Sequence, residues 1–202
     1  MLIGMIIFSR IPNTLMRITG GQVKGRIIAS PKGMNIRPTS DRVREAIFNL
    51  IGQDLSGLKV LDLFAGTGSL GLESLSRGTQ HAVFIDNSQQ ALKLIRKNLV
   101  TCGFENSGTV LRRDLKKAAT LSHPVFKQRF DLLFLDPPYR GDMLIPLLEK
   151  ISTADILSNR SRVVVELSKN EILPCSFGDL KTADSRRYGD TMINIYAHEV
   201  TP

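Results

Sequence analysis

The segment VLDLFAGTGSLG, residues 60–71, combines an apolar strand, a glycine-rich turn and the start of a helix. Its glycines have the Gly-x-Gly-x-x-Gly spacing of nucleotide-binding folds, in which the turn lets the backbone approach the ligand closely. Asp86 follows Gly66 by 20 residues and ends the next apolar run, where a carboxylate that binds ribose hydroxyls is expected. The segment therefore predicts an α/β fold that binds a nucleoside-containing cofactor.

The chain around this segment alternates between apolar strands and amphipathic helices from residue 59 onward. Near-continuous apolar strands separated by helices are typical of a parallel sheet that is covered on both faces. A turn at 188–190 joins two final strands, which we expect to be antiparallel. The expected strands are 59–64, 81–86, 109–113, 131–136, 162–167, 180–187 and 191–198, and the expected helices are 70–76, 89–102 and 143–152.

The first 54 residues differ from this pattern. Residues 2–8 are apolar, but a secretory signal would need a basic region before them and a cleavage site after them, and neither is present. Met16-Arg17-Ile18 looks like a more natural start, so we interpret residues 1–15 as an extension that is dispensable for activity. Residues 17–29 predict a β-hairpin, and 41–52 predict a helix that Thr39 or Ser40 caps. We expect three regions: the extension (1–15), a basic appendage (16–54) and a main domain (55–202).

The charge of the chain is unevenly distributed. Lys and Arg number 27 against 19 Asp and Glu, which gives a formal net charge of +8 over 202 residues. Residues 1–58 hold eight basic and three acidic side chains, so they carry five of these eight charges. Such an excess fits a polyanionic partner, because Lys and Arg neutralise phosphates and release counterions. The first quarter of the chain therefore predicts a nucleic-acid-binding surface.

Other composition features narrow the class of protein. Cys102 and Cys175 form neither a disulfide pair nor a metal-binding spacing, and the three histidines are scattered. No apolar stretch approaches the length of a membrane span. We expect a monomeric protein of the reducing cytoplasm that uses no metal and binds no membrane.

Two cofactor classes fit the glycine segment: nicotinamide dinucleotides and S-adenosylmethionine. The carboxylate of Asp62 would repel a pyrophosphate, but it can pair with the ammonium group of a methionine moiety. The turn FAGTG (64–68) is longer on its strand side than a dinucleotide turn, and Asp114 ends the third strand near the expected adenine. We therefore favour S-adenosylmethionine and keep a nicotinamide oxidoreductase as an alternative. The residues that we expect to contact it are Asp62, Phe64, Ala65, Gly66, Thr67, Gly68, Ser69, Asp86, Asn87, Asp114 and Leu115.

The fourth strand ends in Asp136-Pro137-Pro138-Tyr139, the predicted catalytic edge. Successive prolines cannot continue a strand ladder, and they hold the backbone stiff, so that carbonyl oxygens point outward. Asp136 and the Pro137 carbonyl can accept the two N–H bonds of an exocyclic base amine, which directs its lone pair at a sulfonium methyl group. Tyr139 can stack on the base, which must be unpaired or flipped out of a helix. The tetrapeptide therefore predicts an amino-methyltransferase.

The tetrapeptide and the glycine segment together resemble enzymes that methylate DNA adenine N6, RNA guanine N2 or protein glutamine N5. The glutamine enzymes usually carry Asn in place of Asp136. The DNA enzymes usually carry an inserted target-recognition region, for which this chain has no room. A DNA adenine-N6 methyltransferase stays the main alternative, and a non-catalytic RNA-binding module is a weaker one.

A sharper resemblance lies in RPTSDRVREAIFN (37–49), MRITGG (16–21), KGR (24–26) and LGLESLSRG (70–78). These strings are similar to the bacterial small-subunit rRNA methyltransferase D family, which methylates guanine N2 in 16S rRNA. The resemblance runs from Met16 to about Tyr196, and 115–130 is the variable part within it. It implies a class I, Rossmann-like methyltransferase fold with a seven-stranded, mostly parallel sheet whose last strand is antiparallel. It also implies a hairpin arm for RNA and action on the 30S subunit, with RNA contacts expected at Arg17, Lys24, Arg26, Arg37, Thr39 and Arg42.

Overall fold

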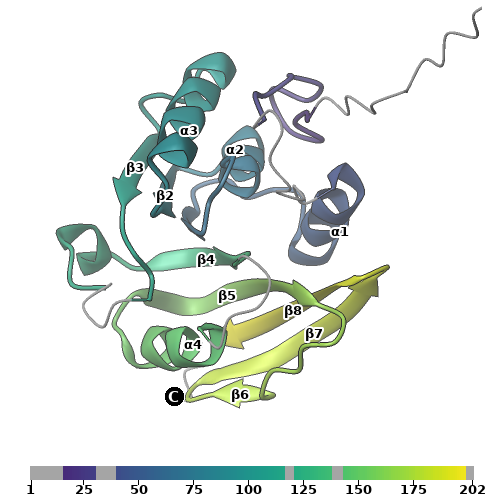
Figure 1. Ribbon diagram of the computed structural model, residues 1–202, viewed down its shortest axis with the longest axis vertical. Helices are drawn as coiled ribbons and strands as arrows, with labels where there is room; N and C mark the ends of the chain where they lie inside the picture. The colour runs from purple at the N-terminus through teal and green to yellow at the C-terminus, as the bar shows by residue number, and fades with distance from the viewer. Residues whose placement is uncertain (1–15, 31–39, 117–120, 138–142, 199–202) are drawn as a thin grey trace, which may run out of the picture.

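The computed structural model describes residues 16–30, 40–116, 121–137 and 143–198 (Figure 1). Its helices and strands follow one another in the alternating order that the apolar pattern predicts. In chain order they are α1 (Asp41–Ile51), β1 (Lys59–Leu63), α2 (Ser69–Ser76), β2 (His81–Asp86), α3 (Gln89–Cys102), β3 (Gly108–Arg112), a 3-10 turn η1 (Pro124–Lys127), β4 (Phe130–Leu135), α4 (Leu144–Thr153), β5 (Leu157–Ser168), β6 (Ser176–Phe177), β7 (Leu180–Tyr188) and β8 (Thr191–His198).

One sheet runs through the described part of the chain, with strand order β3-β2-β1-β4-β5-β8-β7-β6. The first five strands pair in parallel, and β8, β7 and β6 are joined by antiparallel pairing. The sheet has eight strands where the resemblance implied seven, because the two-residue β6 adds a short edge. Chain order reverses between β1 and β4, so their carboxyl ends form the switch point at which open α/β sheets bind ligands.

Two buried cores lie on the two faces of the sheet, and alternate residues of each central strand point into one or the other. Val60, Phe84, Phe134 and Val164 pack on the face that α1, α2 and α3 cover. The other core lies against α4 and includes Leu61, Ile85, Leu133 and Val165. Figure 1 shows α1, α2 and α3 together on one side of the sheet and α4 on the other.

The basic N-terminal segment is packed onto the main domain. Its predicted hairpin is present with a single bridge between Arg17 and Ile27, because turns occupy most of residues 20–25. Met16, Ile18 and Ile28 are buried in the same core as α1 and the sheet. Whether this segment acts as an RNA-binding appendage stays a prediction.

The boundaries of the helices agree with the pattern to within one or two residues. Ser40 caps α1, since its hydroxyl accepts the Val43 amide at 3.3 Å, whereas Thr39 lies outside the described residues. The largest difference is in β5, which begins at Leu157, whereas the prediction placed its start at residue 162. Residues 158–161 of this strand are polar, so the sequence shows no apolar run there. No helix in the described ranges has the length and apolar character needed to cross a membrane.

Candidate active site

The glycine turn between β1 and α2 is held in place by the carboxylate of Asp86. Its Oδ2 accepts the Gly66 amide at 2.9 Å, and its Oδ1 accepts the Ser88 amide at 2.8 Å at the start of α3. Gly66 and Gly68 have positive φ angles of 53° and 77°, which the tight turn requires and which L side chains rarely adopt. The expected cofactor carboxylate thus lies directly beside the turn.

Asp62 lies deeper, at the end of β1, and is only 2% exposed. Its Oδ2 accepts the Gly71 amide at 3.0 Å, in the first turn of α2. The pKa of Asp62 is raised to about 7, mainly by burial and in part by the negative charge of Asp86, while the hydrogen bond from Gly71 opposes this rise. Gly71 is required by close packing, because a Cβ there would lie 2.3 Å from the ring of Phe84.

These carboxylates decide between the two cofactor classes. A dinucleotide pyrophosphate would bind free amides at the start of the helix after the glycine turn. Here the amides of Gly66 and Gly71 already donate to Asp86 and Asp62. Carboxylates therefore lie beside the turn, and these hydrogen-bond acceptors fit the hydroxyls of a neutral ribose and an ammonium group but oppose a pyrophosphate.

The residues expected around an adenine come together next to Asp86. The Arg113 amide donates to the Asp86 carbonyl at 3.1 Å, which brings Asp114 and the buried Leu115 to this edge. Asn87 is exposed, and its carbonyl accepts Arg112 Nε at 3.0 Å. The structure therefore places the cofactor residues predicted from strands β2 and β3 in one region.

Four other residues that are predicted to contact the cofactor, at positions 64, 65, 67 and 69, belong to the glycine turn and the start of α2. Thr67 and Ser69 are each 7% exposed, and the Thr67 hydroxyl lies 3.5 Å from Sδ of Met16. Phe64 has a positive φ of 65° and is half-buried, and Ala65 is buried with its amide bonded to the Ile85 carbonyl at 2.9 Å. These four residues shape the turn that a cofactor would meet.

Asp136 lies level with Asp86 on the other side of the turn. Leu63 of β1 pairs with Ile85 of β2 and with Leu135 of β4, so the next residues of both outer strands are at the same height. Neighbouring strands lie about 4.8 Å apart, so the two carboxylate-bearing strand ends are about 10 Å apart across β1. Asp136 is half-buried and Pro137 is buried. Pro138 and Tyr139 lie outside the described residues.

Asn98, which the pattern analysis did not single out, connects the turn to the N-terminal segment. Its Nδ2 donates at 3.0 Å to the carbonyls of both Thr67 and Ala29, and its Oδ1 accepts the Ala29 amide at 2.8 Å. The side chain is fully buried. The sequence does hold a sign of this contact, because Asn98 is a polar residue on the apolar face of the helix predicted at 89–102.

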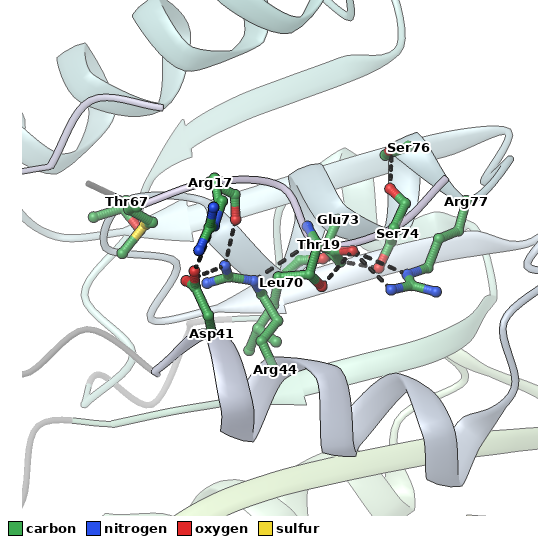
Figure 2. A network of polar contacts seen from close by, with 12 residues as sticks. Arg17, Thr19, Asp41, Arg44, Thr67, Leu70, Glu73, Ser74, Ser76 and Arg77 are labelled. Atoms are coloured by element: carbon green, nitrogen blue, oxygen red, sulfur yellow. Dashed lines mark hydrogen bonds and ion pairs between the residues drawn. The ribbon is translucent and has the colours of Figure 1, made fainter. Parts of the chain in front are cut away.

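A buried ionic network joins α1 and α2 to the N-terminal segment (Figure 2). At its centre is the fully buried carboxylate of Glu73, which accepts the Thr19 amide at 2.8 Å and Arg77 Nη2 at 2.8 Å. The fully buried Arg44 of α1 lies 3.3 Å from Glu73 Oε2 and 2.8 Å from Asp41 Oδ1. The guanidinium of Arg77 also stacks 4.5 Å from the ring centre of Phe48.

The same network gives a structural reason for three sequence segments that were interpreted above only through their resemblance to a known family. The Ser76 hydroxyl donates to the Gly20 carbonyl at 2.6 Å and accepts the Val23 amide at 3.1 Å. A Cβ at Gly21 would lie 1.9 Å from the Ser76 carbonyl oxygen. MRITGG, VREAIF and LESLSR therefore fit one another and fix α1 relative to the glycine turn.

The predicted RNA-binding residues that the structure describes lie at the surface. Arg17, Lys24, Arg26 and Arg42 are all exposed, and Arg17 forms a 3.4 Å ion pair with Asp41. Arg37 and Thr39 lie outside the described residues. Among the described residues, no group of three or more His, Cys, Asp or Glu side chains could hold a metal ion.

Comparisons with known proteins agree with this arrangement. The family model described as "Conserved hypothetical protein 95" matches residues 16–197. A putative rRNA methyltransferase of Bacillus subtilis, YlbH, is 38% identical over 90% of this chain and 98% of its own length. Ribosomal RNA small subunit methyltransferase D of Escherichia coli is 30% identical over 91% of this chain and 90% of its own.

A solved structure also shares the whole architecture. It is titled a putative methyltransferase, yhhF, from Escherichia coli, and superposes with a TM-score of 0.79 at 29% identity over 93% of this chain and 99% of its own. The α/β fold predicted from the glycine segment, and the class I methyltransferase fold that the family resemblance implied, are thus confirmed.

Proposed function

Because this chain belongs to the small-subunit rRNA methyltransferase D family, we propose that it methylates the exocyclic N2 amine of a guanine in 16S rRNA, with S-adenosylmethionine as donor. The observation that carries the proposal is the position of Asp136 and Pro137. They end β4 at the level of Asp86, beside the glycine turn. A methyl donor in the turn and an amine held at Asp136 would therefore meet at one edge of the sheet.

Different residues of the chain bind different parts of the donor. The carboxylate of Asp86 accepts the ribose hydroxyls, Asp62 pairs with the ammonium group, and the backbone of 64–68 packs against the ligand. Asp114 and Leu115 border the adenine. S-adenosylmethionine, when bound there, supplies a methyl group on a positively charged sulfur.

Asp136 and Pro137 act on the methyl acceptor. The amine of guanine is a poor nucleophile, because its lone pair is delocalised into the ring. The Asp136 carboxylate and the Pro137 carbonyl accept its two N–H bonds and direct the lone pair toward the methyl group. Asp136 and Pro137 would hold the amine in line with the methyl group of bound S-adenosylmethionine, and this positioning would supply most of the acceleration. The N–C bond would form as the C–S bond breaks, and the Asp136 carboxylate would take up the proton that the nitrogen loses.

The basic N-terminal segment supports an RNA substrate. The exposed basic residues are Arg17, Lys24 and Arg26 on the segment and Arg42 on α1. Glu73 of α2, the helix that follows the glycine turn, contacts Thr19 of the segment and Arg44 of α1 and so holds both in place. Phosphate contacts made there would place the RNA relative to the reacting groups without reading its sequence.

The proposal is tested by offering the protein labelled S-adenosylmethionine with 30S subunits, with naked 16S rRNA and with duplex DNA. We expect label in the ribosomal RNA and none in the DNA. Label in DNA alone would refute the proposal in favour of an adenine-N6 enzyme. Binding of a nicotinamide cofactor without binding of S-adenosylmethionine would refute the methyltransferase assignment.

A further inference from the structure

A group of basic side chains covers the outer face of α3 and the end of the neighbouring strand β3. Its members, which we call the α3 basic surface, are all exposed and are Lys93, Arg96, Lys97 and Arg112. Residues 87–113 hold five basic side chains and a single acidic one, Glu105. Within the described part of the chain, no member of this surface forms an ion pair with a carboxylate. Its positive charge is therefore not neutralised there.

The α3 basic surface lies between the N-terminal segment and the edge of the sheet. On one flank of α3, Arg96 Nη2 donates to the Val110 carbonyl of β3 at 3.5 Å. On the other flank, Asn98 binds the backbone of Ala29 in the N-terminal segment. Figure 1 shows α3 with β3 on one side and with α2 and this segment on the other. The α3 basic surface therefore extends the basic surface of the segment toward β3.

Arg112 brings this surface to the edge of the sheet that holds the candidate active site. It pairs with Asp86 in the register of β3 and β2, and Asp86 is level with Asp136. Val110 packs against the core that α3 covers, so Arg112, two residues further along the strand, lies on the same face. The ends of β3 and β4 are three strand spacings apart, which is about 14 Å. RNA bound here would therefore lie within a few nucleotides of a base held at Asp136.

The positions of these charges do not benefit the helix that carries them. Lys93 lies three residues before Arg96 and four before Lys97, and like charges at these spacings destabilise a helix. The last turn of α3, where a cation would stabilise the helix dipole, holds no basic residue. A charge beside an edge strand can prevent pairing with other chains, which gives Arg96 a structural role next to β3. This role does not account for the two lysines, because only Arg96 of the three contacts β3 among the described residues.

We propose that the α3 basic surface binds phosphates of the rRNA backbone near the target nucleotide, as a second RNA-binding surface beside the N-terminal segment. This inference rests on the proposed function. Exposed Lys and Arg side chains neutralise phosphates and release counterions, so such contacts strengthen binding most at low salt. They position RNA without reading its sequence. Phosphates bound at both surfaces would hold the RNA on either side of the glycine turn's helix, α2, and present the target base to Asp136.

The test removes the two lysines of this surface, which lie outside the donor site. The dissociation constant for naked 16S rRNA is measured over a series of salt concentrations for the wild type and for Lys93→Gln with Lys97→Gln. The slope of log K against log salt should fall by about two, which is about one for each lost phosphate contact. Lys93→Arg with Lys97→Arg keeps both charges and should keep the wild-type slope.

Lys127→Gln with Lys181→Gln is the matched control, because it also removes two exposed lysines, one from η1 and one from β7. Its slope should equal that of the wild type. The free energy of unfolding and the affinity for S-adenosylmethionine are measured for every variant and should not fall. Weaker RNA binding by the Gln variant of α3 would then reflect a lost contact with RNA and not a lost fold or donor site.

Two outcomes separate this inference from the proposed function. If the wild type methylates 16S rRNA and the slope of Lys93→Gln with Lys97→Gln is unaltered, or falls no more than that of the control, the inference is overturned while the proposed function stands. If the wild type transfers no methyl group to 30S subunits or to naked 16S rRNA, the proposed function itself fails.

Discussion

Asp62 at the end of β1 accepts a hydrogen bond from the Gly71 amide at 3.0 Å, and this contact joins the sheet to the first turn of α2. The helix packs so closely here that Gly71 leaves no room for a Cβ against Phe84. The same carboxylate lies beside the glycine turn where the ammonium group of the donor is expected. Asp62 therefore lies where it can both hold the turn in place and form an ion pair with a positively charged group of the ligand.

The pH dependence of donor binding follows from this position. Burial, reinforced by the charge of Asp86, raises the pKa of Asp62 to about 7, so the carboxyl group is neutral at lower pH. A neutral group cannot form an ion pair with the ammonium, whose pKa near 8 keeps it charged below pH 7. We expect the affinity for S-adenosylmethionine to fall as pH is lowered from 7 to 5.5, approaching about tenfold per pH unit.

Calorimetric titration across this pH range measures the effect. Asp62→Asn should bind weakly at pH 7 and lose the pH dependence. Asp155→Asn, which changes an exposed carboxylate paired with Arg129, should keep the wild-type profile. A flat wild-type profile would show that Asp62 does not contact the ammonium group.

Asp136 is expected to act on the acceptor and not on the donor. Asp136→Ala removes the carboxylate that accepts an amine N–H, so methyl transfer should fall by about a hundred- to a thousandfold, the range found when one positioned group is removed from an active site. Affinity for S-adenosylmethionine should stay within a few-fold of the wild type. Asp136→Asn keeps an acceptor oxygen and should retain part of the activity. Single-turnover rates and equilibrium binding separate the two effects, and unchanged turnover in the Ala variant would remove Asp136 from the mechanism.

The exposed hairpin residues Lys24 and Arg26 are expected to contact RNA phosphates. Changing both to Gln should weaken RNA binding and reduce the slope of log K against log salt by about one per lost contact. Filter binding over a series of salt concentrations measures this slope. Lys127→Gln with Arg129→Gln removes two charges near α4, on the other face of the sheet, and should leave the slope unaltered. An unaltered slope in the hairpin variant would mean that RNA binds elsewhere.

Glu73 is expected to stabilise the fold through its buried partners. Glu73→Gln would leave the guanidinium groups of Arg44 and Arg77 buried without their shared carboxylate, which typically costs about 3–5 kcal/mol. Urea unfolding measures the loss. The exposed pair of Asp155 and Arg129 is the control, because its disruption by Asp155→Asn should cost about 0.5 kcal/mol or less. A loss below about 1 kcal/mol for Glu73→Gln would contradict the role assigned to this network.

Much of the fold could be predicted from apolar runs and glycine spacing. The strands β1, β2 and β4, which border the site, are short and have an apolar centre, so their ends are visible in the sequence. The acidic residues Asp62, Asp86 and Asp136 lie at or next to these ends. Strand β5 was shortened in the prediction because its residues 158–161, SNRS, are polar and fall where the register with β4 is irregular, between the pairs Phe130–Leu157 and Leu132–Arg162.

The interior contacts between polar residues could not be predicted in the same way. Helix α2 is buried at every position although half of its residues are Ser or Glu, so hydrophobicity gives no indication of its burial. The contact of Glu73 with Thr19 spans 54 residues and depends on the tertiary fold.

The most direct test of the account is the identity of the methylated nucleoside. Small subunits from a strain that lacks this protein are incubated with the purified protein and S-adenosylmethionine, and the 16S rRNA is digested and analysed by mass spectrometry. We expect one N2-methylguanosine per subunit that is absent without the protein and absent with Asp136→Ala. Methylation of an adenine, or of duplex DNA in place of the rRNA, would contradict it.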